Sequence, residues 1–522
     1  MKGSTWGRCA AASAVLLGCL HSMSVGEGQL SSGGQPNVSS GGQPNVSSGG
    51  KGHTGGSAAA AGDSATNTGG DGGAECSKSV QSTAVNSPDD TEQLRGVSVV
   101  QGTLRVGGTV SDLDALTCLE AVEHLEIVGT SRLEQLDGLS NLSVVRSLKL
   151  QGNLALKDIS ALRKLSSIAG DVTIQENPEL ASLAGLDQIV RVDGTFLLGD
   201  SPQVETLTGL SSLGSAGDLH IFQMPGLVDM TGLEGLTTVD EELSISGNER
   251  LQTVRGLENL RAVVALRISG NSRLRDLSGL DQLRAFSDLY LSSNASLETL
   301  DGLSPPTTLV SAMIEENPRL RSLEALSEVE EISGIGYFWD LPNVTTLSGF
   351  RQLARTGGGD ELAQLIFKGL GITNLQGLGA LEQASQLVLA DNAQLTTLRG
   401  LNPAVTLDSF SVGGSPMFTD LGALSRLTQL KGGLGISDCD SFSDLSPLQQ
   451  LTSVGTLGLG RNAALTSLRG LAGLRTITAN LTVHENPLLS TCEVAWLRAN
   501  LINDVPEQSV LILGNADVAC TP

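Results

Sequence analysis

The chain has 522 residues, of which 40% are hydrophobic but only 3% are aromatic, so its core must be built mainly from Leu, Val and Ile. It carries 56 acidic against 32 basic residues, a net charge of −24. That charge repels nucleic acid and anionic membrane surfaces, and we therefore expect no nucleic-acid partner.

Residues 1–18 have the composition of an export signal. A basic start (1–8) and an apolar run (9–17) precede Gly18-Cys19, and the run is too short to span a bilayer. Leu16-Leu17-Gly18-Cys19 resembles the lipobox of bacterial lipoproteins. The resemblance implies that Cys19 is lipidated after cleavage. It also implies an outer-membrane or cell-surface address, because Leu20 stands where some lipoproteins carry the Asp that retains them at the inner membrane. A plain secretory peptide, cut a few residues later to give a secreted protein, is the alternative.

Residues 19–75 are rich in Gly, Ser, Asn, Ala and Thr, and they repeat the octapeptide Ser-Ser-Gly-Gly-Gln-Pro-Asn-Val at Ser31 and Ser39. Such a segment cannot bury enough apolar surface to offset its ordering entropy. We expect a disordered tether.

From near Leu104 to Asn486, a leucine-rich segment of about 23 or 24 residues recurs. One copy reads Leu243-Ser-Ile-Ser-Gly-Asn248, followed by Leu251, Val254 and Leu257. Alternation at period two predicts a strand with Leu and Ile facing inward. Repetition at this period predicts a solenoid, in which each copy is one coil stacked on the next. The expected fold is mainly β, with about 17 coils, one long parallel sheet and little helix.

Each strand is followed by a position that we call the ladder position, where an inward side chain can bond backbone groups left unpaired by the turn. Thr130, Ser201, Ser415 and Cys439 can make a weaker version of this bond, whereas Met224, Leu341 and Gly369 cannot make it through a side chain. Eight residues further on comes a small residue, usually Gly. Because Ala or Pro replaces it in some coils, we expect tight packing rather than a left-handed conformation there. Asn occupies the ladder position at Asn153, Asn177, Asn248, Asn271, Asn294, Asn317, Asn392, Asn462 and Asn486.

The Asn-Pro-x-Leu turns, the x-Gly-Leu-x-x-Leu segments and the ending Asn486-Pro-Leu-Leu-Ser-Thr-Cys492 resemble bacterial relatives of the receptor L domain. The resemblance covers about residues 76–520 and implies a right-handed leucine-rich solenoid. Seventeen coils are more than one receptor L domain normally holds, so the chain is either one continuous solenoid or two merged domains. The irregular stretch 350–371 is the expected boundary or protruding loop.

Four cysteines flank the two ends of the solenoid, and in an exported protein they predict two terminal disulfides. Residues 76–124 then form an N-terminal cap with the first coil, residues 125–486 the solenoid, and residues 487–522 a disulfide-bonded cap. In that cap we expect a short helix at residues 493–501, with its Trp496 laid over the end of the solenoid. Cys439 is expected to be a buried structural thiol. The cysteines assigned to the caps are Cys76, Cys118, Cys492 and Cys520.

Reaction chemistry is nearly absent from the sequence. His124, His220 and His484 fall on coils far apart along the axis, so they cannot converge on a metal or a shared nucleophile. The Asp-rich stretch 437–444 fits neither an EF-hand nor a Gly-rich β-roll. We expect no enzyme activity, no cofactor and no metal.

The outward strand positions are left free by the fold, and in neighbouring coils they carry unusually many aromatic and apolar residues for so aromatic-poor a chain. Such a cluster is typical of recognition surfaces. We expect recognition or adhesion at the cell surface, with a surface protein or glycan as partner and the lipid anchor as the link to the membrane. A passive spacer of the envelope is the alternative, and a hydrolase with an unrecognised site is a third. The candidate ligand-binding residues are Tyr290, Met313, Tyr337, Trp339, Leu365 and Phe367.

Overall fold

The computed structural model describes residues 76–357, 363–502 and 505–517. They belong to a unit that spans Ala74–Pro522. The expected export signal, the lipid site Cys19, the tether and the cap residue Cys520 lie outside the described residues.

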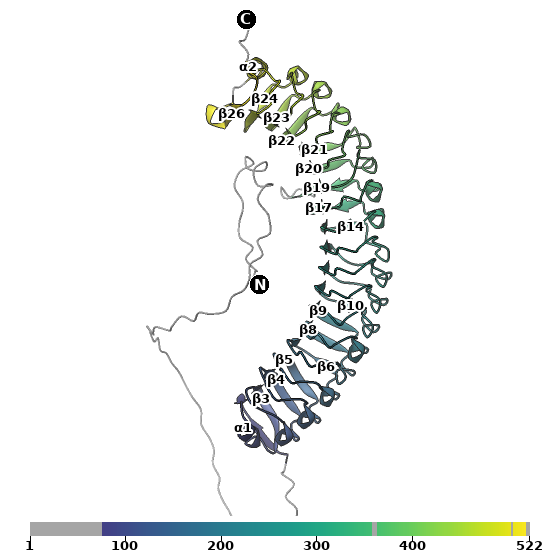
Figure 1. Ribbon diagram of the computed structural model, residues 1–522, viewed down its shortest axis with the longest axis vertical. Helices are drawn as coiled ribbons and strands as arrows, with labels where there is room; N and C mark the ends of the chain where they lie inside the picture. The colour runs from purple at the N-terminus through teal and green to yellow at the C-terminus, as the bar shows by residue number, and fades with distance from the viewer. Residues whose placement is uncertain (1–75, 358–362, 503–504, 518–522) are drawn as a thin grey trace, which may run out of the picture. The chain divides into compact units, whose positions relative to one another are not determined.

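Consecutive coils wind one after another, and all their strands join a single parallel sheet on the concave side of the solenoid unit (Figure 1). Parallel pairing follows because each coil returns the chain to the same edge in the same direction. This confirms the predicted mainly β solenoid of about 17 coils with little helix. The main strands are β2 (Thr83–Val85), β3 (Val97–Val106), β4 (Ala121–Val128), β5 (Val144–Gln151), β7 (Val172–Gln175), β8 (Arg191–Gly199), β9 (Ser215–Phe222), β11 (Glu242–Ser246), β12 (Ala265–Ser269), β13 (Asp288–Ser292), β15 (Ser311–Glu315), β17 (Ile335–Trp339), β19 (Gln364–Lys368), β20 (Gln383–Ala390), β21 (Thr406–Gly413), β22 (Gln429–Ser437), β23 (Ser453–Gly460), β25 (Leu481–His484) and β26 (Val510–Leu513).

Shorter elements complete the coils. The short strands are β1 (Lys78–Val80), β6 (Ser167–Ile168), β10 (Thr238–Val239), β14 (Thr308–Leu309), β16 (Glu331–Ile332), β18 (Arg355–Thr356) and β24 (Thr476–Ile477). The 3-10 turns are η2 (Asp114–Leu116), η3 (Asp137–Leu139), η4 (Ser160–Leu162), η5 (Thr208–Leu210), η6 (Glu324–Leu326), η7 (Ser348–Phe350), η8 (Gly422–Leu424), η9 (Ser446–Leu448), η10 (Arg469–Leu471) and η11 (Glu507–Ser509). The α-helices are α1 (Pro88–Glu92) and α2 (Thr491–Ala499).

Inside the coils, equivalent apolar residues stack on one another. Leu266 of β12 pairs with Leu289 of β13, and both side chains are fully buried. The largest side chains form local clusters: the ring centroids of Phe338 and Phe350 are 4.8 Å apart, and those of Phe338 and Phe367 are 5.4 Å apart. Burial of these stacked columns is the main favourable term of the fold.

The Asn side chains at the ladder positions are fully buried and bonded along the stack. The Asn271 amide Nδ2 donates to the Ile245 carbonyl at 2.9 Å, and its Oδ1 accepts from the Asn248 backbone N–H at 3.0 Å. The ladder also extends one coil beyond the predicted end, since Asn515 Oδ1 accepts from the Asn486 backbone N–H at 3.1 Å. Val510-Leu-Ile-Leu-Gly-Asn515 carries the same strand and turn pattern, which could have revealed this coil.

The expectation that the small residue needs no left-handed conformation holds only in part. In coils with a 3-10 turn, the constraint is space: a Cβ on Gly138 would lie 1.7 Å from the Leu113 carbonyl oxygen. In coils without that turn, as at Gly256 with a φ of +108°, the backbone is left-handed. Ala161 and Pro447 both lie in 3-10 turns, so their presence shows only that coils with such a turn need no left-handed conformation.

Strand β19 has the opposite register from the one expected. Its Leu365 and Phe367 are 0% exposed and face the core, so assigning them to the outer face was wrong. The ladder position of this coil is Leu370, whose backbone N–H donates to Asn392 Oδ1 at 2.9 Å, rather than Gly369. Gly369 instead has a φ of +68°, close to the +66° of Gly270 just before Asn271. A slip of one residue exchanges the two faces of a strand.

Both ends of the stack are covered. The predicted disulfide between Cys76 and Cys118 is confirmed, with their Cα atoms 5.2 Å apart. Helix α1 begins with a capping box formed by Ser87 and Asp90. At the other end Cys492 is disulfide-bonded, and α2 buries Val494 and Leu497 over the last coils. These covers replace the neighbouring coil that a terminal repeat lacks.

Candidate recognition surface

Five adjacent strands, β12, β13, β15, β17 and β19, bring the outward candidates into two continuous columns. Their parallel pairing is in register, so equivalent positions lie side by side at a spacing of about 4.8 Å. One column runs through Arg267, Tyr290, Met313, Tyr337 and Ile366, and the other through Ser269, Ser292, Glu315, Trp339 and Lys368.

We call Tyr290, Met313, Tyr337 and Trp339 the aromatic patch. All four side chains are partly exposed on the outward side of the sheet. The ring centroids of Tyr337 and Trp339 are 6.2 Å apart. Of the six candidates from the sequence, the structure therefore brings four together on the surface and places the other two, Leu365 and Phe367, in the core.

Basic side chains lie over two of these rings. The Arg267 guanidinium is 4.1 Å from the Tyr290 ring centroid, and its Nε is 3.2 Å from Glu242 Oε1. The Lys368 ammonium is 5.2 Å from the Trp339 ring centroid and 3.7 Å from Asp391 Oδ2. These cation–π contacts favour one orientation of the Tyr290 and Trp339 rings, which partly preorganises the surface.

Sequence reasoning missed Ile366 and Lys368 because the register of β19 was slipped by one residue. The correct register had a signal: it turns the Lys368 ammonium outward, whereas the slipped register buries it. Arg267 is a further residue of this surface that the candidate set did not include, and it lies beside Tyr290 on the neighbouring strand.

The centre of the surface is partly desolvated. Burial raises the pKa of the Glu315 carboxyl above its ordinary value, and the neighbouring Glu316 charge adds to this shift. Burial likewise raises the pKa of Tyr337, with smaller contributions from Glu315 and Glu316. A partner that donates a hydrogen bond or a positive charge to Glu315 would relieve this cost.

Cys439 and the Asp-rich stretch 437–444 have structural roles. Burial raises the pKa of the Cys439 thiol to about 12, so its reactive thiolate form is strongly disfavoured. Asp438, in the Asp-rich stretch, forms an ion pair with Arg461, whose side-chain hydrogen bond lowers the pKa of Asp438. Among residues 76–357, 363–502 and 505–517, no group of three or more His, Cys, Asp or Glu side chains could hold a metal ion.

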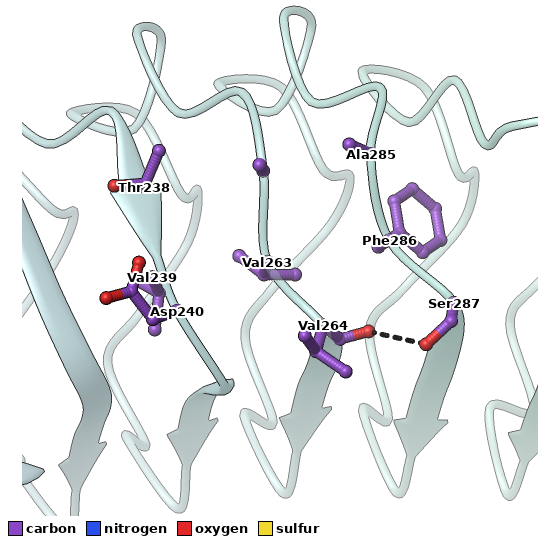
Figure 2. A pocket seen from close by; sticks show the side chains of 9 residues that line it. Thr238, Val239, Asp240, Val263, Val264, Ala285, Phe286 and Ser287 are labelled. Atoms are coloured by element: carbon purple, nitrogen blue, oxygen red, sulfur yellow. Dashed lines mark hydrogen bonds between the residues drawn. The ribbon is translucent and has the colours of Figure 1, made fainter.

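An apolar groove of about 360 Å³ lies beside the sheet, where β10 and the two following coils turn toward their main strands (Figure 2). Val239, Val263 and Phe286 form its buried floor. Val264 at its edge is 46% exposed, and its carbonyl accepts a hydrogen bond from the Ser287 hydroxyl at 3.2 Å. The groove has few polar groups to orient a ligand, so we assign it no function.

Across the part of the chain that the structure describes, no helix combines the length and apolar character needed to cross a bilayer.

Stacked coils, one parallel sheet and a buried Asn ladder define the chain as a leucine-rich-repeat β-solenoid. No family model matches it, and no curated protein matches it either. Similar solved structures include an internalin from Listeria monocytogenes (18% identity, 83% of this chain and 90% of that chain covered, TM-score 0.22). Others are TLR13 in complex with ssRNA13 (14% identity, 81% and 86%, TM-score 0.23) and a leucine-rich-repeat protein of Leptospira interrogans (14% identity, 75% and 92%, TM-score 0.31). These TM-scores are too low to carry an argument about function.

Proposed function

We propose that this protein is an exported recognition or adhesion module that binds a surface protein or glycan through the concave face of its sheet. The observation that carries the proposal is the aromatic patch, which gathers four large side chains on adjacent strands of an aromatic-poor chain. Tyr, Trp, Met and Arg are the residues enriched at the centres of protein interfaces. Their presence together favours a protein partner over a glycan.

The remaining parts of the proposal come from the sequence. Cys19 is proposed as the lipidation site that anchors the protein to a bacterial membrane, more specifically the outer membrane or cell surface, with residues 19–75 as the tether. Kinship with the receptor L domain stays a proposal too. It transfers no ligand, because binding function belongs to the site and not to the fold.

The test replaces Tyr337 and Trp339 by Ser in the full chain and compares the capture of envelope components with that of the unchanged protein. Because interface aromatics account for much of the binding energy, we expect about tenfold weaker capture or more, measured as binding of the captured partner. Leu197→Ser is the matched control, since Leu197 is a partly exposed apolar residue on β8 outside the patch.

Both variants should keep the thermal stability of the unchanged chain to within a few degrees. Unaltered capture by the double variant would support the passive spacer instead, and unfolding of the double variant would show that the two rings belong to the core.

A further inference from the structure

A second surface feature lies in the turns that follow the ladder positions, away from the outward columns of the sheet. In four successive coils the residue two after the ladder position is Arg250, Arg273, Ser296 and Arg319. Because Ser296 is short, a hollow of about 300 Å³ opens between the arginines on either side of it. We call this hollow the arginine pocket; its lining residues are Gln252, Arg273, Arg275, Ser296 and Arg319.

Three exposed guanidinium groups line the arginine pocket. Within the described residues, Arg273, Arg275 and Arg319 make no side-chain ion pair or hydrogen bond, and all three are exposed. Glu298, two residues after Ser296, forms an ion pair with Arg321, whose Nη2 lies 3.2 Å from Glu298 Oε2. Some other arginines of this acidic chain do pair with carboxylates, as Arg461 does with Asp438 and Arg351 with Glu324.

The hydrogen-bond donors that line the arginine pocket indicate which class of ligand it can bind. Guanidinium groups, the Gln252 amide and the Ser296 hydroxyl all donate hydrogen bonds, and no carboxylate lines the pocket. Guanidinium forks match the oxygen pairs of phosphate and sulfate groups. A tetrahedral anion also offers enough oxygens to engage several arginines at once, which a single carboxylate does not. We propose that the arginine pocket binds a phosphate or sulfate group.

Backbone bonds hold the pocket in place. The Arg275 N–H donates to the Gln252 carbonyl at 3.3 Å, and the Glu298 N–H donates to the Arg275 carbonyl at 2.9 Å. The ladder residues Asn271, Asn294 and Asn317 bond one another just before these turns. Successive coils therefore keep the arginines at a fixed spacing of about 4.8 Å per coil, so that Arg273 and Arg319 are separated by about two such steps.

The experiment measures the binding of sodium phosphate and sodium sulfate to the full chain by calorimetry at constant ionic strength, with sodium chloride as the reference salt. Dextran sulfate and neutral dextran are measured in parallel, so that a free anion and a polymer-borne sulfate are distinguished. The test variant carries Arg273→Gln and Arg319→Gln together. The control is Arg132→Gln, since Arg132 has the same place after ladder residue Thr130 but Ala155 follows it in the next coil.

We expect phosphate, sulfate or dextran sulfate to bind the unchanged protein and the Arg132→Gln variant equally, and the double variant at least about tenfold more weakly, the loss typical of removing charge-assisted hydrogen bonds. The proposal is overturned if none of these anions binds more tightly than chloride, or if the double variant binds as the unchanged protein does. The aromatic patch is untouched by these substitutions, so the result is independent of the proposed partner site.

Discussion

At the scale of single residues, the buried amide of the ladder has a role that other side chains fill only in part. Asn271 satisfies two backbone carbonyls, those of Ile245 and Ser269, and accepts from the backbone N–H of Asn248. At Met224 the side chain makes no such bonds, but its backbone N–H still donates to Asn248 Oδ1 at 3.0 Å. An apolar ladder residue is therefore tolerated where the next coil supplies the amide.

Replacement of Asn271 by Ala should lower the free energy of unfolding by about 1 to 3 kcal/mol, because it leaves the buried Asn248 N–H and the Ile245 carbonyl unpaired. Chemical denaturation measured by circular dichroism checks this value. Asn343→Ala is the control, since Asn343 is exposed and donates a single hydrogen bond to the Pro318 carbonyl. We expect the control to change stability by less than about 0.5 kcal/mol. Equal effects of the two substitutions would contradict a structural ladder.

At the scale of elements, the coil is the unit of the fold. Each main strand between the two ends pairs with the strands of the preceding and following coils, as β12 does with β11 and β13. Apolar columns pass through equivalent positions of the coils, and the Asn column passes through most of them, so removing one whole coil leaves matching surfaces in contact. Removing part of a coil does not, because the inward and outward residues of the next strand lose their register.

Deletion of residues 248–270, one 23-residue repeat, joins Gly247 to Asn271 and restores a ladder Asn after β11. We expect the shortened protein to keep its strand signal in circular dichroism and a cooperative thermal transition. Deletion of residues 248–258 removes only half a repeat and serves as the comparison. It should lose much of that cooperativity. Equal behaviour of the two deletions would argue against the coil as the stacking unit.

At the scale of the whole molecule, the chain has a net charge of −24, and its N-terminal segment holds the proposed lipidation site Cys19 and the proposed tether. The net charge opposes direct adsorption to anionic membrane surfaces. Anchoring through lipid at Cys19 would overcome that repulsion, since several acyl chains bind a membrane far more strongly than one.

Labelling of expressing bacteria with a radioactive fatty acid tests the anchor. We expect label in the unchanged protein and recovery of most of it in the membrane fraction, because acylation adds about 0.8 kcal/mol of membrane affinity per buried CH₂. Cys19→Ser should carry no label, whereas Cys439→Ser, which changes a buried thiol of the solenoid, should be labelled like the unchanged protein. Absence of label in the unchanged protein would point to secretion instead.

The amino-acid sequence determined the solenoid, because strand alternation and the 23-residue period are local patterns that each coil repeats. The Asn ladder and the disulfide between Cys76 and Cys118 were also visible as patterns, and so was the outward placement of Tyr290, Met313, Tyr337 and Trp339. The final coil at Asn515 carried a pattern as well, although its signal was overlooked.

The tertiary structure settled the register after the irregular stretch of residues 350–371, because the extra residues there break the count on which the repeat depends, and the charge of Lys368 was the sequence signal for the correct register. It buried Leu365 and Phe367 and turned Ile366 outward. It also showed which arginines find carboxylates and which meet around a hollow. Whether an arginine pairs with a carboxylate or lines a hollow depends on the positions of side chains from different coils, and the repeat pattern does not contain that information.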